Sequence, residues 1–221
     1  MSGFVTALQL AIRLLTHERR RLVACVGGIS VALILMLLQV GFRTALLDSA
    51  LELLRQLDAD VIVINKEKQP FLARDTMALE RLYQSLSIPG VAEAAPVWVT
   101  LQRWKNHETN TLHPIRVIGF DPDRATFLME DLQEQIPLLK TPDTAIVDSR
   151  SRSSYGDLDP DPAQIGRIQI EIVGQTRLGT DFEVDGTMLV SEATFSHLTG
   201  FPTDTLEAVL LKLDPGEDPD R

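Results

Sequence analysis

The sequence predicts an α+β protein that is held in a membrane by one helix, and three observations support this fold class. Residues 22–42 form an uninterrupted apolar run, short β-rich segments follow from residue 61 onward, and amphipathic helical segments separate those strands. Alternating strands mixed with separate helices argue against a parallel, doubly wound sheet. A chain of 221 residues is long enough for one domain and a small appendage.

Charge is divided unevenly along the chain, although the whole carries a formal net charge of −10. Residues 1–43 hold five basic side chains and one acidic side chain, a balance of +4, and the remaining 178 residues carry −14. An acidic folded part argues against nucleic-acid binding, which requires a basic surface. Disorder is not expected, because 44% of the residues are hydrophobic. The single cysteine, Cys25, excludes an internal disulfide and a thiolate zinc site.

Residues 1–21 are expected to lie at the cytoplasmic face of the membrane. Residues 3–16 place their apolar side chains on one side of a helix, and such a helix suits the membrane interface. The alternative is that this segment extends the spanning helix into the cytoplasm.

Residues 22–42 are the expected transmembrane helix. They carry no charge and would span roughly 31 Å as a helix, which matches the hydrocarbon core of a bilayer. Arg19, Arg20 and Arg21 precede this run, and acidic residues follow it. The positive-inside rule therefore predicts an inner-membrane protein with its N-terminus in the cytoplasm and its bulk in the periplasm. A cleaved signal peptide is the alternative, but its apolar core would be shorter than this one.

Small residues recur every four positions within the expected span, at Ala24, Gly28 and Ala32. This spacing places them on one helix face, where another helix could approach closely. The alternative is chance, because glycine and alanine are common in spanning helices.

A helical stalk is expected over residues 43–57, where leucines recur at helical spacing, and it leads directly into a periplasmic domain over residues 58–213. Residues 214–221 form an acidic tail. Within the domain we expect strands at residues 61–65, 94–103, 114–120, 145–147, 165–178, 187–190 and 208–213. Helices are expected at residues 76–86, 124–136 and 191–198.

No motif for catalysis, a cofactor or a metal is found in the sequence. A phosphate-binding glycine loop, a nucleophile elbow and a His-Glu-x-x-His pair are all missing. His107, Glu108 and His113 flank a polar turn, which makes a metal site improbable. The acidic series at Asp157, Asp159 and Asp161 is not a calcium loop, because proline and isoleucine occupy its glycine and glutamate positions. Four serines have no nearby base: Ser149, Ser151, Ser153 and Ser154.

Six ordered stretches resemble the N-terminal part of DevC-type permeases, which belong to the MacB/FtsX-like ABC exporters. These stretches are residues 38–50, 58–65, 102–106, 117–122, 148–156 (Asp-Ser-Arg-Ser followed by Tyr155-Gly156) and 185–191. The resemblance follows the chain in order along roughly residues 3–214, which is nearly its whole length. Members of the family carry three further spanning helices after the periplasmic domain, whereas this sequence has no second apolar run of 18 residues. The resemblance therefore implies a fragment, a split gene product or a truncated form of a permease.

The resemblance implies a non-enzymatic subunit that forms a homodimer and works with a separate ATP-binding subunit. ATP hydrolysis in the cytoplasm would move the stalk, and the periplasmic domain would pass the motion to a periplasmic adaptor (membrane fusion) protein and indirectly to an outer-membrane channel. DevC-type relatives are associated with glycolipid export, which implies a lipid-like or other envelope substrate. Two other hypotheses are a single-span, periplasm-facing binding or sensor protein and an anchored enzyme with an unrecognised site.

Overall fold

The computed structural model describes residues 7, 17, 19–65, 76–159, 162–179 and 184–217, without the side chains of residues 47–50 and 52. The chain divides into two compact units, Met1–Asp48 and Ser49–Arg221. The interfacial helix expected over residues 3–16 lies outside the described residues, apart from Ala7, as do residues 66–75 and the end of the acidic tail.

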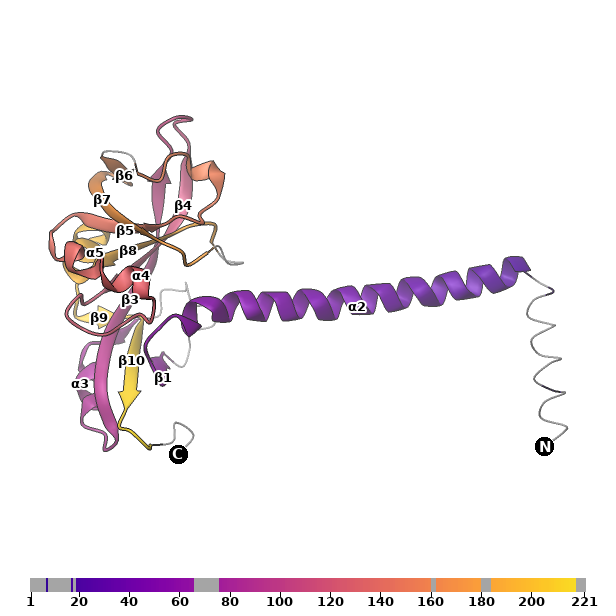
Figure 1. Cartoon of the computed structure of the whole chain (residues 1–221), viewed down its shortest axis with the longest axis horizontal. Coiled ribbons are helices and arrows are strands. Elements are labelled where there is room, and N and C mark those ends of the chain that lie inside the picture. Colours follow the sequence, from indigo (N-terminus) through magenta and orange to yellow (C-terminus); the bar gives the residue numbers. More distant parts are fainter. Residues whose placement is uncertain are drawn as a thin grey trace. The chain divides into compact units, whose positions relative to one another are not determined.

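A single helix, α2 (Arg19–Arg55), includes both the segment predicted to span the membrane and nearly all of the predicted stalk (Figure 1). Within it, Arg19–Leu46 is long and apolar enough to cross a membrane, and none of the side chains in its most apolar window is buried. Exposed apolar side chains on all sides are typical of a helix that faces lipid. The predicted fold class, an apolar N-terminal helix followed by a mixed α+β domain, is confirmed.

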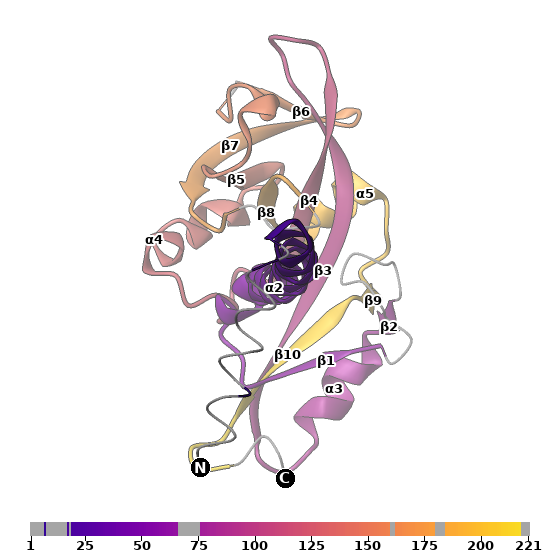
Figure 2. The same ribbon diagram turned by 90° about the vertical axis from the view of Figure 1, so that its right-hand side faces the viewer.

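The domain is built on one eight-stranded mixed sheet in the order β1-β10-β3-β4-β8-β5-β7-β6 (Figure 2). The strands are β1 (Val61–Ile64), β3 (Val91–Lys105), β4 (Leu112–Phe120), β5 (Thr144–Asp148), β6 (Ala163–Ile165), β7 (Ile168–Thr176), β8 (Thr187–Ser191) and β10 (Ala208–Leu213). The pairs β4–β8 and β5–β7 are parallel, and the other neighbours are antiparallel. A bridge between Trp104 and Ile165 also pairs β6 with β3, so the strands from β3 to β6 close on themselves.

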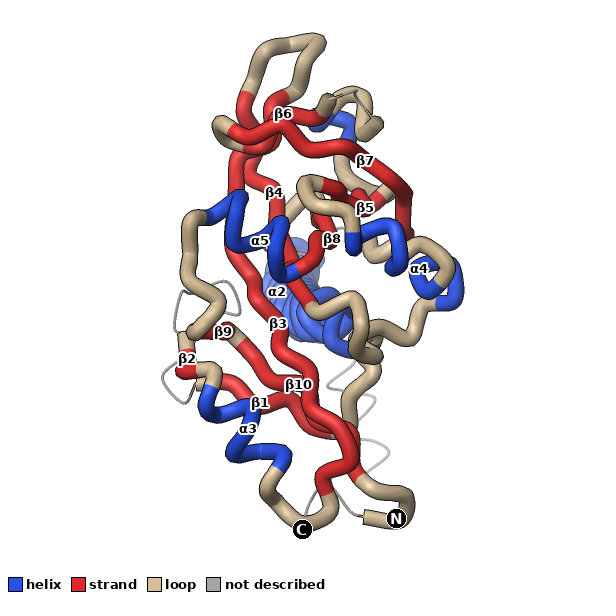
Figure 3. Tube along the Cα trace, turned by 90° about the vertical axis from the view of Figure 1, so that its left-hand side faces the viewer, coloured by secondary structure: helices blue, strands red, loops and turns tan. Residues whose placement is uncertain are grey.

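Each face of the sheet has its own hydrophobic core. Helices α3 (Glu80–Leu86) and α5 (Glu192–Thr199) lie on the same side of the sheet (Figure 3) and contribute Leu82 and Phe195 to the first core. The second core lies on the other face and receives the end of α2, α4 (Glu130–Gln133) and a 3₁₀ turn, η1 (Ile136–Lys140). Covering both faces explains why β5 and β8 are buried at every position.

Three predicted elements were wrong in part, each because a tertiary contact overrides local preference. The helix expected over residues 124–136 is reduced to α4, since Leu57 and Phe127 form an antiparallel bridge that keeps the chain before α4 extended. The helix expected from residue 76 begins only at Glu80, because β2 (Met77–Ala78) pairs with β9 (Thr205–Leu206). The strand expected over residues 165–178 is split into β6 and β7 by a turn in which Gly166 has a φ of +60°.

Candidate functional site

The end of α2 is built into the domain at a place that we call the joint, which comprises residues 53–60 and the groups they contact. Leu53 and Leu54 pack against the second core, and Leu57 is 6% exposed within it. Leu54 and Leu57 belong to the stripe that the sequence predicted for the stalk. A fully buried apolar side chain contributes roughly 1.5–3 kcal/mol, so the buried Leu57, together with the partly buried Leu53 and Leu54, holds the last turn in place.

Backbone hydrogen bonds fasten the joint to the segment that follows β4. The amide of Leu128 donates to the carbonyl of Gln56 at 2.8 Å, and the amide of Asp58 donates to the carbonyl of Thr126 at 3.0 Å. With the Leu57–Phe127 bridge between them, these bonds form a short antiparallel ladder. Because backbone hydrogen bonds in an antiparallel ladder form only at a particular orientation of the two strands, this ladder fixes the direction of the chain as it leaves α2.

Charged groups fasten the joint to β10 as well. Nζ of Lys212 lies 2.8 and 2.7 Å from the two carboxylate oxygens of Asp58. The amide of Leu213 donates to Oδ2 of Asp60 at 2.8 Å, and the amide of Asp60 donates to the carbonyl of Leu211 at 2.9 Å. The hydrogen bond to Asp58 raises the pKa of Lys212, with the charges of Asp58, Glu93 and Asp60 adding to it.

A small polar cavity lies behind this ion pair. Its charged lining comes from Asp58, Glu93, Arg124 and Lys212, which balance two negative against two positive charges. Arg124 also bonds to Asp121 at 3.0 Å and to the carbonyl of Ala94. The joint therefore connects the end of α2 to β10, to the start of β3 and to the segment after β4.

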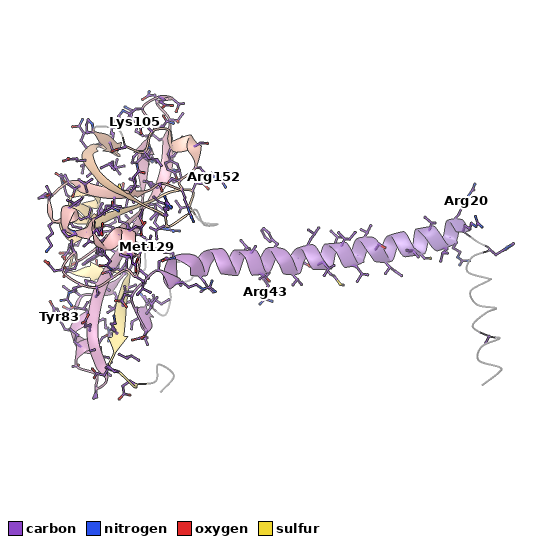
Figure 4. The ribbon with its side chains drawn as sticks, in the orientation of Figure 1. Arg20, Arg43, Tyr83, Lys105, Met129 and Arg152 are labelled. Atoms are coloured by element: carbon purple, nitrogen blue, oxygen red, sulfur yellow. The ribbon has the colours of Figure 1, made fainter. Side chains whose placement is uncertain are left out.

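The residues predicted for topology and for helix packing all lie on α2. Arg19, Arg20 and Arg21 form its first turn, and Figure 4 shows Arg20 at that end with Arg43 farther along. Ala24, Gly28 and Ala32 are exposed on a single face, and a Cβ placed on Gly28 would meet no atom within 4 Å.

Several stretches that carried the family resemblance meet at the end of the domain where Lys105 and Arg152 lie (Figure 4). The indole of Trp104 donates to the carbonyl of Tyr155 at 3.0 Å, and the hydroxyl of Tyr155 donates to the carbonyl of Pro114. Asn106 donates to the carbonyl of Ser154 at 2.9 Å and accepts the amides that follow it in the hairpin turn. The polar groups of these side chains are used in hydrogen bonds to the backbone, which indicates that they stabilise the hairpin between β3 and β4.

Two glycines in those stretches are required by close packing. A Cβ on Gly156 would lie 2.8 Å from Oδ1 of Asn106, and a Cβ on Gly186 would lie 2.8 Å from Cζ of Tyr155. Gly156 also has a φ of +72°, which disfavours other residues. These contacts could not be predicted from local patterns, because the residues that touch lie in separate stretches of the sequence.

Three other candidate residues are held by local bonds, and Asp161 lies outside the described residues. The hydroxyls of Ser149 and Ser151 donate to the carbonyls of Thr176 and Asp148, and His113 bonds to Thr111. Within the described part of the chain, no three His, Cys, Asp or Glu side chains gather as metal ligands would.

Two titratable groups in the domain have shifted pKa values. Asp148 is fully buried, and burial raises the pKa of its carboxyl although the amide of Arg150 donates to it at 3.0 Å. Burial, together with the negative charge of Asp185, raises the pKa of Tyr155 to about 12.

No protein-family model and no curated protein sequence matches the chain. Among solved structures, the extracellular domain of the ABC-type transporter YknZ from Gram-positive bacteria is similar at 13% identity and a TM-score of 0.43, over 70% of this chain and 83% of that one. The periplasmic region of MacB from Actinobacillus actinomycetemcomitans is similar at 5% identity and a TM-score of 0.44, over 65% and 68%. Both TM-scores lie below 0.5.

Proposed function

We propose that this chain is a membrane-anchored permease subunit of an ABC-type exporter, or the N-terminal part of one. One observation carries the proposal: α2 runs without a break from Arg19 to Arg55, and the joint then fastens its end to the domain. A continuous helix that ends in a fixed joint passes displacement along its axis, whereas a flexible tether would absorb it.

The proposed topology has the N-terminus in the cytoplasm and the domain in the periplasm. Arg19, Arg20 and Arg21 would hold their end of α2 on the cytoplasmic side of the inner membrane. Residues 22–42 would span the bilayer, and residues 43–57 would form the stalk. The face that carries Ala24, Gly28 and Ala32 would pack against another helix, such as that of a second copy.

The proposed mechanism needs no catalytic residue in this chain. A separate cytoplasmic subunit would hydrolyse ATP, and α2 would pass the resulting motion to the joint. The domain would pass it to a periplasmic adaptor and through it to an outer-membrane channel, for export of lipid-like or other envelope molecules. The resemblance of the sequence motifs supports these partners.

The partner ATPase can be tested by purifying the tagged full chain in detergent from its own cells. We expect an ATP-binding subunit to co-purify and the preparation to hydrolyse Mg-ATP. A chain with a flexible four-residue Gly-Ser insertion between Leu57 and Asp58 should retain that subunit but lose any ATP-dependent change of a fluorophore on the domain. The same insertion after Asn110, in the exposed hairpin turn, is the matched control. Purification without any ATP hydrolase would favour the single-span binding or sensor protein instead.

The topology can be tested separately with single cysteines in a Cys25→Ser background. A cysteine at the exposed Tyr83 should react with a membrane-impermeant maleimide in intact spheroplasts. A cysteine at His17 should react only after lysis. The opposite pattern would contradict the proposed orientation.

A further inference from the structure

The hairpin of β3 and β4 extends beyond the second core and exposes part of one face of the sheet. Side chains at alternate positions of a strand lie on the same face. Val97 and Val99 are buried in the second core, so Leu101, Arg103 and Lys105 continue the same face of β3. Leu101 is 43% exposed, Arg103 is exposed and Lys105 is half-buried. We call this surface, together with the residues opposite it on β4, the hairpin face.

The strand register determines which residues of β4 belong to the hairpin face. Pro114 lies opposite Arg103, and Leu112, which is 54% exposed, lies opposite Lys105. The hairpin face therefore combines two exposed leucines with two cations. Trp104 lies on the reverse side of the hairpin, where it is fully buried and hydrogen-bonded, so the strand beneath the hairpin face is held in place.

The cations of the hairpin face have no partner in the part of the chain that the structure describes. There, Arg103 and Lys105 take part in no ion pair and in no side-chain hydrogen bond. Residues 100–119 hold three basic side chains and one acidic side chain, a balance of +2, whereas the chain after residue 43 carries −14. Unpaired cations beside exposed leucines match a partner that presents carboxylates and apolar groups.

We propose that the hairpin face docks an acidic and partly apolar surface of the periplasmic adaptor protein. The inference rests on the adaptor in the proposed function and names the surface of this chain that contacts it. Arg103 and Lys105 pair with carboxylates of the adaptor, and Leu101 and Leu112 pack against its apolar side chains. Ion pairs that are enclosed by apolar contacts are screened less by water and salt than exposed pairs are.

Strand β3 connects the hairpin face to the joint. The carbonyl of Ala94 on β3 accepts a hydrogen bond from Arg124, which lines the cavity of the joint. At roughly 3.3 Å per residue, the strand covers about 35 Å from Ala94 to Lys105. A continuous strand that is paired on both sides resists bending, so the joint and the hairpin face move together.

An anionic membrane surface fits the hairpin less well than an acidic protein does. The turn of the hairpin, residues 106–111, consists of polar residues and contains Glu108, whose carboxylate is repelled by lipid phosphates. The two leucines lie behind this turn on the flat of the sheet, where a bilayer could reach them only by enclosing the polar turn.

The docking surface can be tested with the photoreactive residue p-benzoylphenylalanine at Leu112 of the full chain in its own cells. We expect a crosslink to a periplasmic protein, at a peptide that contains aspartate or glutamate. The same residue at the exposed Tyr83, at the opposite end of the domain (Figure 4), is the matched control and should not give this product. A crosslink to phospholipid, a crosslink to a second copy, the same product from both positions or no crosslink would overturn the proposal. An ATP-binding subunit that still co-purifies in that case would leave the proposed function intact, and its loss would overturn both.

A charge exchange tests the chemistry of the contact, with the purified crosslinked protein as the probe and the full chain in lipid nanodiscs. Arg103→Glu combined with Lys105→Glu should weaken binding roughly tenfold at low salt, and the difference should shrink as salt rises. Lysine in place of the carboxylates at the crosslinked peptide should restore binding to the double variant. Arg81→Glu, an exposed arginine on α3, is the matched control, and circular dichroism confirms that each variant is folded. Unchanged binding by the double variant, or failure of the exchange to restore it, would overturn the pairing of these cations with carboxylates.

Discussion

Nζ of Lys212 lies 2.8 and 2.7 Å from the two carboxylate oxygens of Asp58, so a residue on the last strand holds the residue at which the stalk enters the domain. The two residues are 154 positions apart in the sequence. The side chain of Asp58 is 20% exposed and that of Lys212 is 44% exposed, so water screens the pair only in part. This ion pair closes the joint on the side of β10.

A double-mutant cycle with Asp58→Asn and Lys212→Met should give a coupling energy of about 0.5–1 kcal/mol, as expected for a partly screened ion pair. Urea unfolding of the full chain in detergent measures it. The same cycle on the more exposed Lys140–Asp123 pair is the control and should give less. Because the pKa of Lys212 is raised above 10.5, its contribution is complete at neutral pH and is lost only as pH rises through the raised pKa. A coupling no larger than that of the control would contradict a specific role in the joint.

The buried carboxyl of Asp148 should make stability depend on pH in the direction opposite to that of an ordinary ion-paired acid. Its folded pKa lies above 3.8, so the folded state holds a proton over a pH range in which the unfolded state has lost it. Wild type should therefore gain stability relative to Asp148→Asn as the pH falls from 7 toward 4. Thermal unfolding at a series of pH values measures the difference. A difference that stays constant over this range would show that Asp148 does not titrate differently on folding.

Tyr155 should titrate late, because its pKa is raised to about 12 from 10.0. The chain contains two tyrosines, and Tyr83→Phe at an exposed position leaves Tyr155 as the only one. Ultraviolet absorbance of that variant should show ionisation well above pH 10 while the domain is folded. Since the unfolded state ionises first, the domain should lose stability as pH rises above 10. Ionisation near pH 10 with the fold intact would contradict the buried position of the ring.

The losses of stability caused by substituting Gly174 and Gln135 should not be additive. The side-chain amide of Gln135 accepts the amide of Gln175 and donates to its carbonyl, each at 2.9 Å, so it binds the edge of β7 as a strand would. A Cβ on Gly174 would lie 1.9 Å from Oε1 of Gln135. Gly174→Ala should therefore displace Gln135 and cost about 1–3 kcal/mol of stability through overpacking and lost bonds.

Gln135→Ala removes the group that Gly174→Ala displaces, so the double variant should be scarcely less stable than Gln135→Ala alone. Chemical denaturation of the four proteins measures this. Fully additive losses would show that the alanine methyl is accommodated without moving Gln135.

Local patterns in the sequence were sufficient for the long helix and for most strands. The apolar run after Arg21 predicted a helix of spanning length, and α2 contains it without interruption. Alternation or short β-branched runs predicted β1, β5, β8 and β10 to within two residues at each end. These features depend on neighbours in the chain, so a sequence pattern can reveal them.

Contacts between segments that are distant in the sequence determined the features that local patterns did not predict. Phe127 and Leu128 lie in a segment with helical periodicity, but they pair with the end of α2 and stay extended. The convergence of Trp104 with Tyr155 was equally hidden, since the two lie in separate motifs.

The sequence by itself therefore determined the apolar helix, the uneven charge and the α+β class, because hydrophobic periodicity and composition are local properties. Only the tertiary structure decided the strand order and the joint between Asp58 and Lys212. Those depend on which surfaces bury one another, and burial is a property of the whole fold.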